Sequence, residues 1–367
     1  MSISIFQHTQ KSYSEAVFAL LGKGRLHAMH LYSLWFRKGG IEGIWNAVEP
    51  QAVKLVQEMI AATDFSLPEL SGDKREAETL KFLLRFSDGL ESESVLIPME
   101  SGKTLCLSSQ VGCRMGCSFC ETGKMGLIRH LTTQEIVAQV FHARFALNAA
   151  IRNLVFMGMG EPLDNYDAVM QAIKVLTDPA GMGFGPSRIT LSTSGKVEEI
   201  YRLIEDADPA LNLAVSVNAP SDEVRSKLMP VNHTWDMAAL KEAMRAYCAH
   251  PRREILVEYV LIQGINDALE HADLLAQYLD GLRVKVNLIP YNPQRRDRYL
   301  PPESSAKEAF LERMREKGYQ TLLRGTKGQK IMAACGQLGN VEVRRELIKK
   351  RLVPSLNNFP QKDYSPA

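Results

Sequence analysis

Three cysteines fall within eight consecutive residues of the stretch VGCRMGCSFCETGKMG, which covers residues 111–126. Their spacing, C-x₃-C-x₂-C, places Cys113, Cys117 and Cys120 in one short loop. Thiolates are soft ligands that suit zinc or an iron–sulfur cluster. A structural zinc site or a fully ligated cluster takes four protein ligands, so three thiolates leave one position open. In a [4Fe–4S] cluster, the open iron could chelate an adjacent amine and carboxylate, a pair that S-adenosylmethionine (SAM) offers.

Two other interpretations of these cysteines stay open. Zinc could be completed by a distant residue, or the cysteines could lie together by chance. The chain has only six cysteines among 367 residues, which does not resemble a secreted disulfide scaffold. In a reducing compartment, clustered cysteines more often indicate metal binding or catalysis. We therefore favour the cluster.

The elements that must position this loop alternate between short β-rich runs and helical patterns from about residue 104. Such alternation predicts parallel strands joined by crossover helices. The predicted strands cover 104–109, 153–158, 188–193, 211–217, 254–262, 284–290 and 319–324. The fold class is therefore α/β, and we expect a partial (β/α)₆ barrel, although the period alone does not exclude a doubly wound sheet.

The flanking segments have other patterns. Residues 1–70 are predicted to form a helical accessory domain, because apolar residues recur there at helical spacing. Residues 67–76 read as a linker rich in turn formers, and 71–103 as a whole are predicted to be linker and β-hairpin. The barrel is expected over 104–325, followed by a tail with a basic helix over 326–367.

The amino-acid composition limits the classes of function that the protein can have. The 44 basic and 42 acidic residues nearly cancel, so any surface for nucleic acid must be local. The first residues lack the basic segment and apolar run of a signal peptide, and no run approaches eighteen apolar residues. We expect a cytoplasmic protein that does not act at a membrane.

Five motifs in register resemble a known family. They are CLSSQVGC with the three cysteines, FMGMGEPL, LSTSG, LIPYNP and AACGQL. In this order, from about Glu93 to Asn340, they closely resemble the RlmN/Cfr family of radical-SAM RNA adenine methyltransferases. We identify the chain as a divergent member, because the family commonly has His where Asn218 stands and an acidic residue where Lys330 stands. Asn keeps a donor and an acceptor but does not titrate near neutrality.

The resemblance implies the cofactors and their ligands. It implies one [4Fe–4S] cluster on the three cysteines, SAM as the second cofactor, and RNA binding by the N-terminal helices. The implied SAM contacts are Gly160, Glu161, Ser192, Ser216, Val217, Asn218 and Asn292. FMGMGEPL also ends a predicted strand, where barrel sites lie, and its glycines let backbone groups approach a ligand.

The resemblance further implies three catalytic residues. Cys335 matches the cysteine that takes a methyl group from one SAM, and a second SAM is cleaved to a radical that abstracts hydrogen from this S-methyl group. Cys106 matches a cysteine that removes a proton and closes a transient, catalytic disulfide with Cys335. Glu93 matches a proton acceptor.

The implied activity is methylation of an adenosine carbon in rRNA, tRNA or both, with C2 favoured over C8. Both carbons are electron-poor and do not attack SAM directly, so a radical route is implied. The implied partners are RNA and an electron donor such as a flavodoxin-type reductant. The alternatives are a radical-SAM enzyme on another substrate, or a non-catalytic metal-binding RNA module on the same fold. Retention of Cys106, Cys335 and the cysteine triad favours the enzyme.

Overall fold

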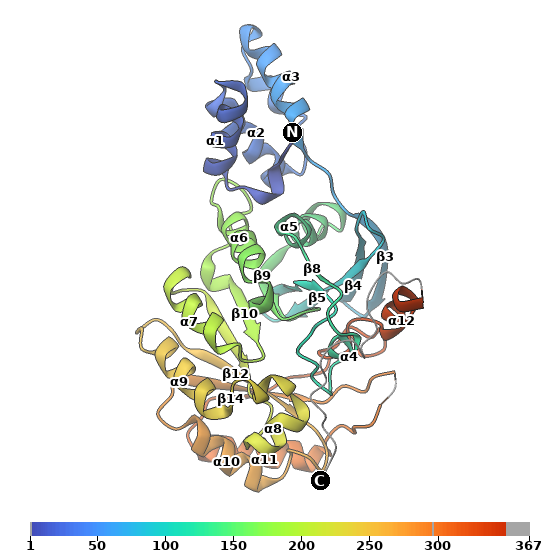
Figure 1. The fold of residues 1–367 in the computed structure, drawn as a ribbon, viewed down its shortest axis with the longest axis vertical. Helices are drawn as coiled ribbons and strands as arrows, with labels where there is room; N and C mark the ends of the chain where they lie inside the picture. Colours follow the sequence, from blue (N-terminus) through green and yellow to red (C-terminus); the bar gives the residue numbers. More distant parts are fainter. Residues whose placement is uncertain (1, 296, 350–367) are drawn as a thin grey trace.

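A single ten-stranded sheet organises the chain. The structure is a computed structural model that describes residues 2–295 and 297–349. Within these residues the strand order is β14-β13-β12-β11-β10-β9-β6-β5-β4-β3 (Figure 1). Among the described helices, none is long and apolar enough to cross a membrane. The predicted tail over 326–367 is described only as far as residue 349.

Seven neighbouring strands of this sheet are parallel, which confirms the predicted strand–helix alternation. They are β6 (Gly102–Cys106), β9 (Ile151–Phe156), β10 (Ile189–Thr193), β11 (Asn212–Ser216), β12 (Ile255–Leu261), β13 (Val284–Pro290) and β14 (Thr321–Leu323). The crossover helices are α5 (Thr133–Phe141), α6 (Tyr166–Thr177), α7 (Val197–Asp206), α8 (Asp222–Leu228), α9 (Met237–Cys248), α10 (Leu269–Leu279) and α11 (Ser304–Glu316). The sheet is therefore the expected partial barrel, with the short β14 added beyond the sixth parallel strand.

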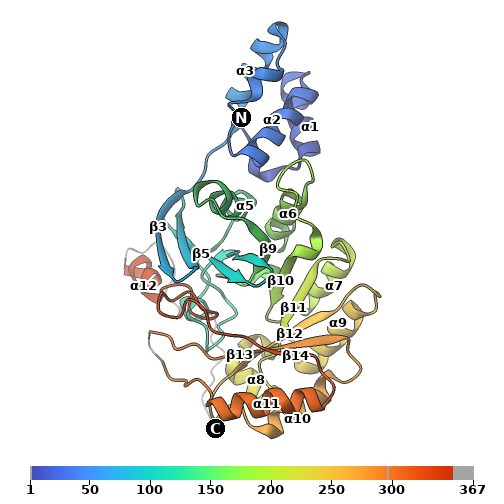
Figure 2. The ribbon, with the colours of Figure 1, turned by 180° about the vertical axis from the view of Figure 1, so that it is seen from behind.

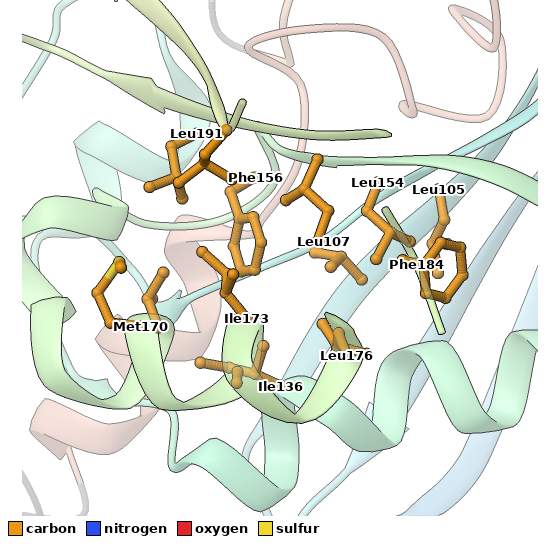
Figure 3. Close-up of a cluster of buried hydrophobic side chains, with 14 of the residues drawn as sticks. Leu105, Leu107, Ile136, Leu154, Phe156, Met170, Ile173, Leu176, Phe184 and Leu191 are labelled. Carbon is orange, nitrogen blue, oxygen red and sulfur yellow. The ribbon is translucent and has the colours of Figure 1, made fainter. Parts of the chain in front are cut away.

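The apolar core fixes the strands against the helices. Leu105, Leu154 and Leu191 on the strands face Ile136 of α5 and Ile173 of α6 (Figure 3). All five side chains are buried, and this close packing leaves the strands little freedom to shift. α5 begins at the N-cap Thr132, whose side chain accepts from the backbone N–H of Glu135. Because the strands are fixed in this way, their carboxyl ends stay together at one edge of the sheet.

Three antiparallel strands extend the sheet beyond β6. They are β3 (Glu69–Glu76), β4 (Thr79–Arg85) and β5 (Glu91–Met99). The predicted hairpin is confirmed as β4 and β5, but the predicted linker over 67–76 is wrong, because β3 pairs with β4 along its length. ELSGDKRE lacks an apolar alternation because β3 is an exposed edge strand, where charged residues discourage further pairing.

Three helices lie at the end of the molecule away from α10 and α11 (Figures 1 and 2). They are α1 (Gln10–Leu21), α2 (Arg25–Lys38) and α3 (Val53–Ala62), flanked by the paired short strands β1 (Ile3–Ser4) and β2 (Thr63–Asp64). Phe6 packs edge-on against Phe141 of α5, with the ring centroids 5.3 Å apart. Trp35 stacks on the same Phe141 ring, with the centroids 4.9 Å apart. The helical character predicted for this segment is confirmed, and this aromatic contact joins the helices to the barrel. The division into domains stays a prediction.

Candidate active site

The three cysteines lie in the loop between β7 (Gln110–Val111), which pairs with β8 (Arg129–His130), and α4 (Glu121–Met125). The N–H of Cys113 donates to the carbonyl of Gly126 at 3.2 Å, and the N–H of Cys120 donates to that of Cys117 at 3.1 Å. Gly112 has a φ of +75°, and a Cβ there would lie 1.9 Å from the Gly126 oxygen. Only glycine fits this position, so Gly112 lets the loop close.

The donor set of this loop fits a cluster. All three cysteines line one cavity, and burial raises the pKa of each thiol. A metal centre would displace these protons and stabilise the thiolates. Within residues 2–295 and 297–349, no three His, Cys, Asp or Glu side chains converge as ligands of a single ion. Three soft thiol ligands from one loop suit an iron–sulfur cluster that keeps one iron without a protein ligand, whereas zinc would need a further ligand.

The carboxyl ends of the parallel strands form the opposite wall of the cavity. Because these ends meet at one edge of a barrel, residues far apart in sequence come together there. The predicted SAM contacts that line the cavity are Gly160, Glu161, Ser192, Ser216, Asn218 and Asn292. Val217 is not among the lining residues, since its side chain is fully buried behind the strand end.

Glu161 joins two of these strand ends. One carboxylate oxygen accepts from the N–H and the hydroxyl of Ser194, both at 2.8 Å, and the other accepts from the N–H of Leu163 at 3.1 Å. Burial raises the pKa of Glu161, and the hydrogen bonds from Ser194 oppose this shift. Carboxylate oxygens have further lone pairs, so an ammonium group in the cavity can still donate to Glu161.

The side chain of Asn218 contacts other residues of the protein. Its side-chain oxygen accepts from the N–H of Val260 at 2.8 Å, and its amide nitrogen contacts the sulfur of Met229 at 3.3 Å. Its φ of +57° is left-handed, a conformation in which Asn and His are both enriched. The departure from the family's His therefore fits the backbone here, and the second N–H of the side-chain amide could donate to a ligand in the cavity.

The loop that carries Cys335 lies against the cysteine loop. The carbonyl of Cys335 accepts from the side chain of Asn292 at 3.0 Å, and the carbonyl of Gly336 accepts from the N–H of Glu121 at 2.7 Å. The hydroxyl of Thr122 donates to the carbonyl of Leu338 at 2.6 Å. Cys335 lines the first cavity and also a second one, of about 710 Å³. The predicted methyl carrier thus lies where the two cavities meet.

Comparison with known proteins agrees with this geometry. The sequence model of the Radical SAM superfamily matches residues 107–275. The probable dual-specificity RNA methyltransferase RlmN 1 of Protochlamydia amoebophila is 54% identical over 94% of this chain and 96% of that protein. This chain belongs to the RlmN family. The dual-specificity RNA methyltransferase RlmN of Bdellovibrio bacteriovorus is 43% identical over 78% of this chain and 72% of that protein.

A solved structure extends the match to the fold. The structure of a radical SAM methyltransferase from Sphaerobacter thermophilus is 37% identical in sequence and matches with a TM-score of 0.84. The match covers 92% of this chain and 99% of that protein's chain. The chain is accordingly a radical-SAM methyltransferase, and the RlmN cofactors, a [4Fe–4S] cluster and SAM, are its cofactors. The residues predicted to hold them stay a prediction for this chain.

Cys106 lies outside the first cavity. It ends β6 within an apolar cluster that includes Val95, Met159, Ala333 and Leu338. Burial, followed by the nearby charge of Cys335, raises the pKa of the Cys106 thiol to about 12, so this thiol keeps its proton near neutrality. All six cysteines are free, so the structure does not support the disulfide expected between Cys106 and Cys335. In the structure, Cys106 and Cys335 are both free thiols.

Two charged residues of the site escaped the sequence analysis. Glu258 on β12 lines the first cavity and accepts from the hydroxyl of Ser192 at 2.8 Å. Arg324 follows β14 and lines the second cavity with Cys335. The nearby charge of Cys335 is the main cause of the raised pKa of Arg324, with smaller contributions from Glu258 and Cys106. The lone acid in the apolar run ILVEYVLI could have indicated Glu258, whereas no sequence signal marks Arg324.

Arg225 of α8 also escaped notice. Its guanidinium is fully buried and donates to the carbonyls of Ser194 at 2.6 Å, and of Ser216 and Val217 at 3.2 Å each. It also donates to the side-chain oxygen of Asn232 at 2.8 Å. Burial lowers the pKa of Arg225. One cation thus satisfies the carbonyls at the ends of β10 and β11, which carry predicted SAM contacts.

Replacing Arg225 by Met will therefore destabilise the fold. The change leaves buried carbonyls without donors, and we expect the free energy of unfolding to fall by about 3 kcal/mol. Urea denaturation followed by circular dichroism measures this change. Arg202→Met, on an arginine whose side chain is 50% exposed, is the comparison variant and should lower stability far less, because an exposed ion pair contributes little. Equal stability of the two variants would contradict the role given to Arg225.

Proposed function

We propose that this chain methylates a carbon of an adenosine base in RNA, with Cys335 carrying the methyl group as a thioether. The observation that carries the proposal is the position of Cys335 between two cavities. The first holds the three cysteine thiols and the strand ends that would receive SAM. The second is the larger and would receive the base. The names of the relatives, which are RNA methyltransferases, support RNA as the substrate.

The second cavity suits a nucleobase. It shares Met157, Ile289, Asn292 and Cys335 with the first, and the amides of Asn153 and Asn287 also line it. Apolar walls with a few amide groups are typical of sites that hold a flat ring and hydrogen-bond its edge. A base enclosed in this way has to leave its stack in the RNA first, which favours a loop or an unpaired adenosine.

The reactivity of adenine accounts for a cysteine carrier. C2 and C8 are electron-poor and do not attack the methyl group of SAM, whereas a thiolate does. The Cys335 sulfur would form an S–CH₃ bond as one SAM leaves as S-adenosylhomocysteine, and the thiol proton is lost. A second SAM is consumed in each turnover, and the bound cluster supplies the electron for its cleavage. A one-electron donor of the flavodoxin type would reduce the protein.

Arg324 would assist both cysteines. It lines the second cavity together with Cys335, and its charge interacts with both cysteines. The charge of Arg324 lowers the pKa of the Cys106 thiol and so opposes the rise caused by burial. This thiol would have to lose its proton before it could resolve a protein–RNA adduct. We favour C2 of adenosine over C8, in rRNA, tRNA or both; the relatives' names, which print dual-specificity RNA methyltransferase, support RNA as the substrate class.

Mass spectrometry of RNA nucleosides tests this function. We expect 2-methyladenosine in rRNA and tRNA from cells that contain the protein and its loss when the chain is deleted. Loss of 8-methyladenosine instead would move the reaction to the other carbon. Cluster-loaded protein should also methylate purified RNA but leave an RNase-digested pool unmodified. Methylation that survives RNase digestion, or no change in any nucleoside, would overturn RNA as the substrate.

A further inference from the structure

A buried ion pair on the antiparallel extension lies next to the Cys335 loop. Lys81 of β4 and Glu93 of β5 are diagonal neighbours in the sheet, and Nζ lies 3.2 Å from Oε2. Their side chains are only 5% and 12% exposed. A buried pair of this kind contributes little net stability by itself, so stability alone does not account for its position here.

Both members of the pair contact the loop that carries Cys335. The ammonium of Lys81 donates to the carbonyl of Met332 at 3.1 Å, and the carboxylate of Glu93 accepts from the N–H of Gly339 at 3.4 Å. These two contacts lie three residues before Cys335 and four residues after it. The pair therefore holds the loop on both sides of the thiol.

The first of these contacts supports a strained residue. Met332 has a φ of +54°, a left-handed conformation that costs free energy in a side chain without a local hydrogen-bonding group. Such a conformation persists only where the surroundings hold it. The hydrogen bond from Lys81 to the Met332 carbonyl is one such contact, so its loss should release the segment before Cys335.

Glu93 is poorly placed to meet a substrate. It lines neither cavity that contains Cys335, but a third one with Met159 and Gly339. Its carboxylate already contacts Lys81 and the loop backbone. A proton acceptor needs to lie within hydrogen-bond distance of the proton that it takes. The position of Glu93 thus differs from the one that the family resemblance implies.

We propose that Lys81 and Glu93 form a clasp that fixes residues 332–339 and so holds Cys335 between the two cavities, with Glu93 acting as a positioning residue instead of a proton acceptor. The inference rests on the methyl-carrying role proposed for Cys335. It assigns a function to Lys81, which neither the motifs nor the cavity around the cysteines indicated.

Hydrogen–deuterium exchange on the cluster-loaded protein tests the clasp. Lys81→Met removes the donor to Met332, and we expect backbone amides in 332–339 to exchange about tenfold faster or more, as loss of a hydrogen bond to a charged group predicts. RNA methylation should fall by a similar factor in kcat. Iron content and SAM cleavage without RNA should match the parent, because the side chain of Lys81 contacts Glu93 and Met332 and none of the cysteine triad or predicted SAM contacts.

Three further variants separate positioning from proton transfer. Lys81→Arg keeps a cationic donor and should restore slow exchange and most of the methylation. Glu93→Gln keeps an acceptor for the N–H of Gly339 and should retain methylation to within about tenfold, since one neutral hydrogen bond replaces a charged one. The exchange of the pair, Lys81→Glu with Glu93→Lys, restores opposite charges but faces a carboxylate toward the Met332 carbonyl. The loop should stay loose in that double variant.

The outcomes distinguish the two proposals. Unchanged exchange in Lys81→Met, or full rescue by the exchanged pair, would overturn the clasp. Glu93→Gln that loses all methylation while its loop exchanges at the parent's rate would identify Glu93 as the proton acceptor and also overturn it. If the parent protein itself cleaves SAM but never methylates RNA, the proposed function fails, and the exchange rates still decide the clasp. Should Lys81→Met fail to fold, the comparison of Glu93→Gln with the exchanged pair decides it.

Discussion

Replacement of Cys335 by Ala will abolish methylation of RNA while the protein still binds iron and cleaves SAM. Among residues 332–339 the thiol is the strongest nucleophile toward a methyl group, so its loss should reduce kcat by at least about 10³-fold. The triad is on a different loop, and the contacts to that loop from residues 336 and 338 use backbone carbonyls that the substitution would leave in place. Transfer of labelled methyl groups from SAM to RNA measures the loss.

A second readout follows the carrier directly. In the parent protein, peptide mass spectrometry should find a methyl thioether on Cys335 after incubation with SAM, and none on Cys248. Cys248 is a half-buried cysteine at the end of α9, and Cys248→Ala is the matched control, expected to methylate at the parent's rate. Methylation of RNA by the Cys335 variant would refute the covalent carrier.

Replacement of Cys117 by Ala will remove iron and all reductive cleavage of SAM. Cys117 is the central thiol of the triad, and two thiolates are too few to hold the cluster that the family uses. We expect colourless protein after anaerobic reconstitution, with iron and sulfide reduced to background. Cys113→Ala and Cys120→Ala should behave alike.

Controls separate loss of the cluster from loss of the fold. Circular dichroism of the Cys117 variant should match that of the parent prepared without iron, and Cys248→Ala should stay brown. A parent protein that takes up stoichiometric zinc and no iron would instead favour the metal-binding RNA module. A Cys117 variant with full iron content would show that the triad is not the cluster site.

The sequence allowed prediction of what depends on local pattern. Each parallel strand is a short apolar run, so the seven strands could be located, and topology then requires residues such as Glu161 and Asn292 to meet at one edge. β3 was missed because its pairing is carried by backbone groups under polar side chains. That edge strand has no side-chain periodicity to detect.

The missed site residues depend on contacts between distant segments. Arg225 is defined by carbonyls at the ends of two other elements, and the Lys81 contact to Met332 spans 251 residues. The residues that Arg225 and Lys81 contact cannot be deduced from residue type or from spacing in the sequence. Glu93 could be aligned with a family position, but its surroundings, which decide what a carboxylate can do, come only from the folded chain.

The hydrogen bonds between the Cys335 loop and the cysteine loop link two halves of the chemistry. Glu121 and Thr122, directly after the last cysteine, bind the carbonyls of Gly336 and Leu338. These two donors tie the segment that carries Cys335 to the end of the cysteine loop, so the positions of the two loops depend on each other. A substitution that displaces Glu121 or Thr122 would accordingly move the predicted methyl carrier together with the predicted cluster ligands.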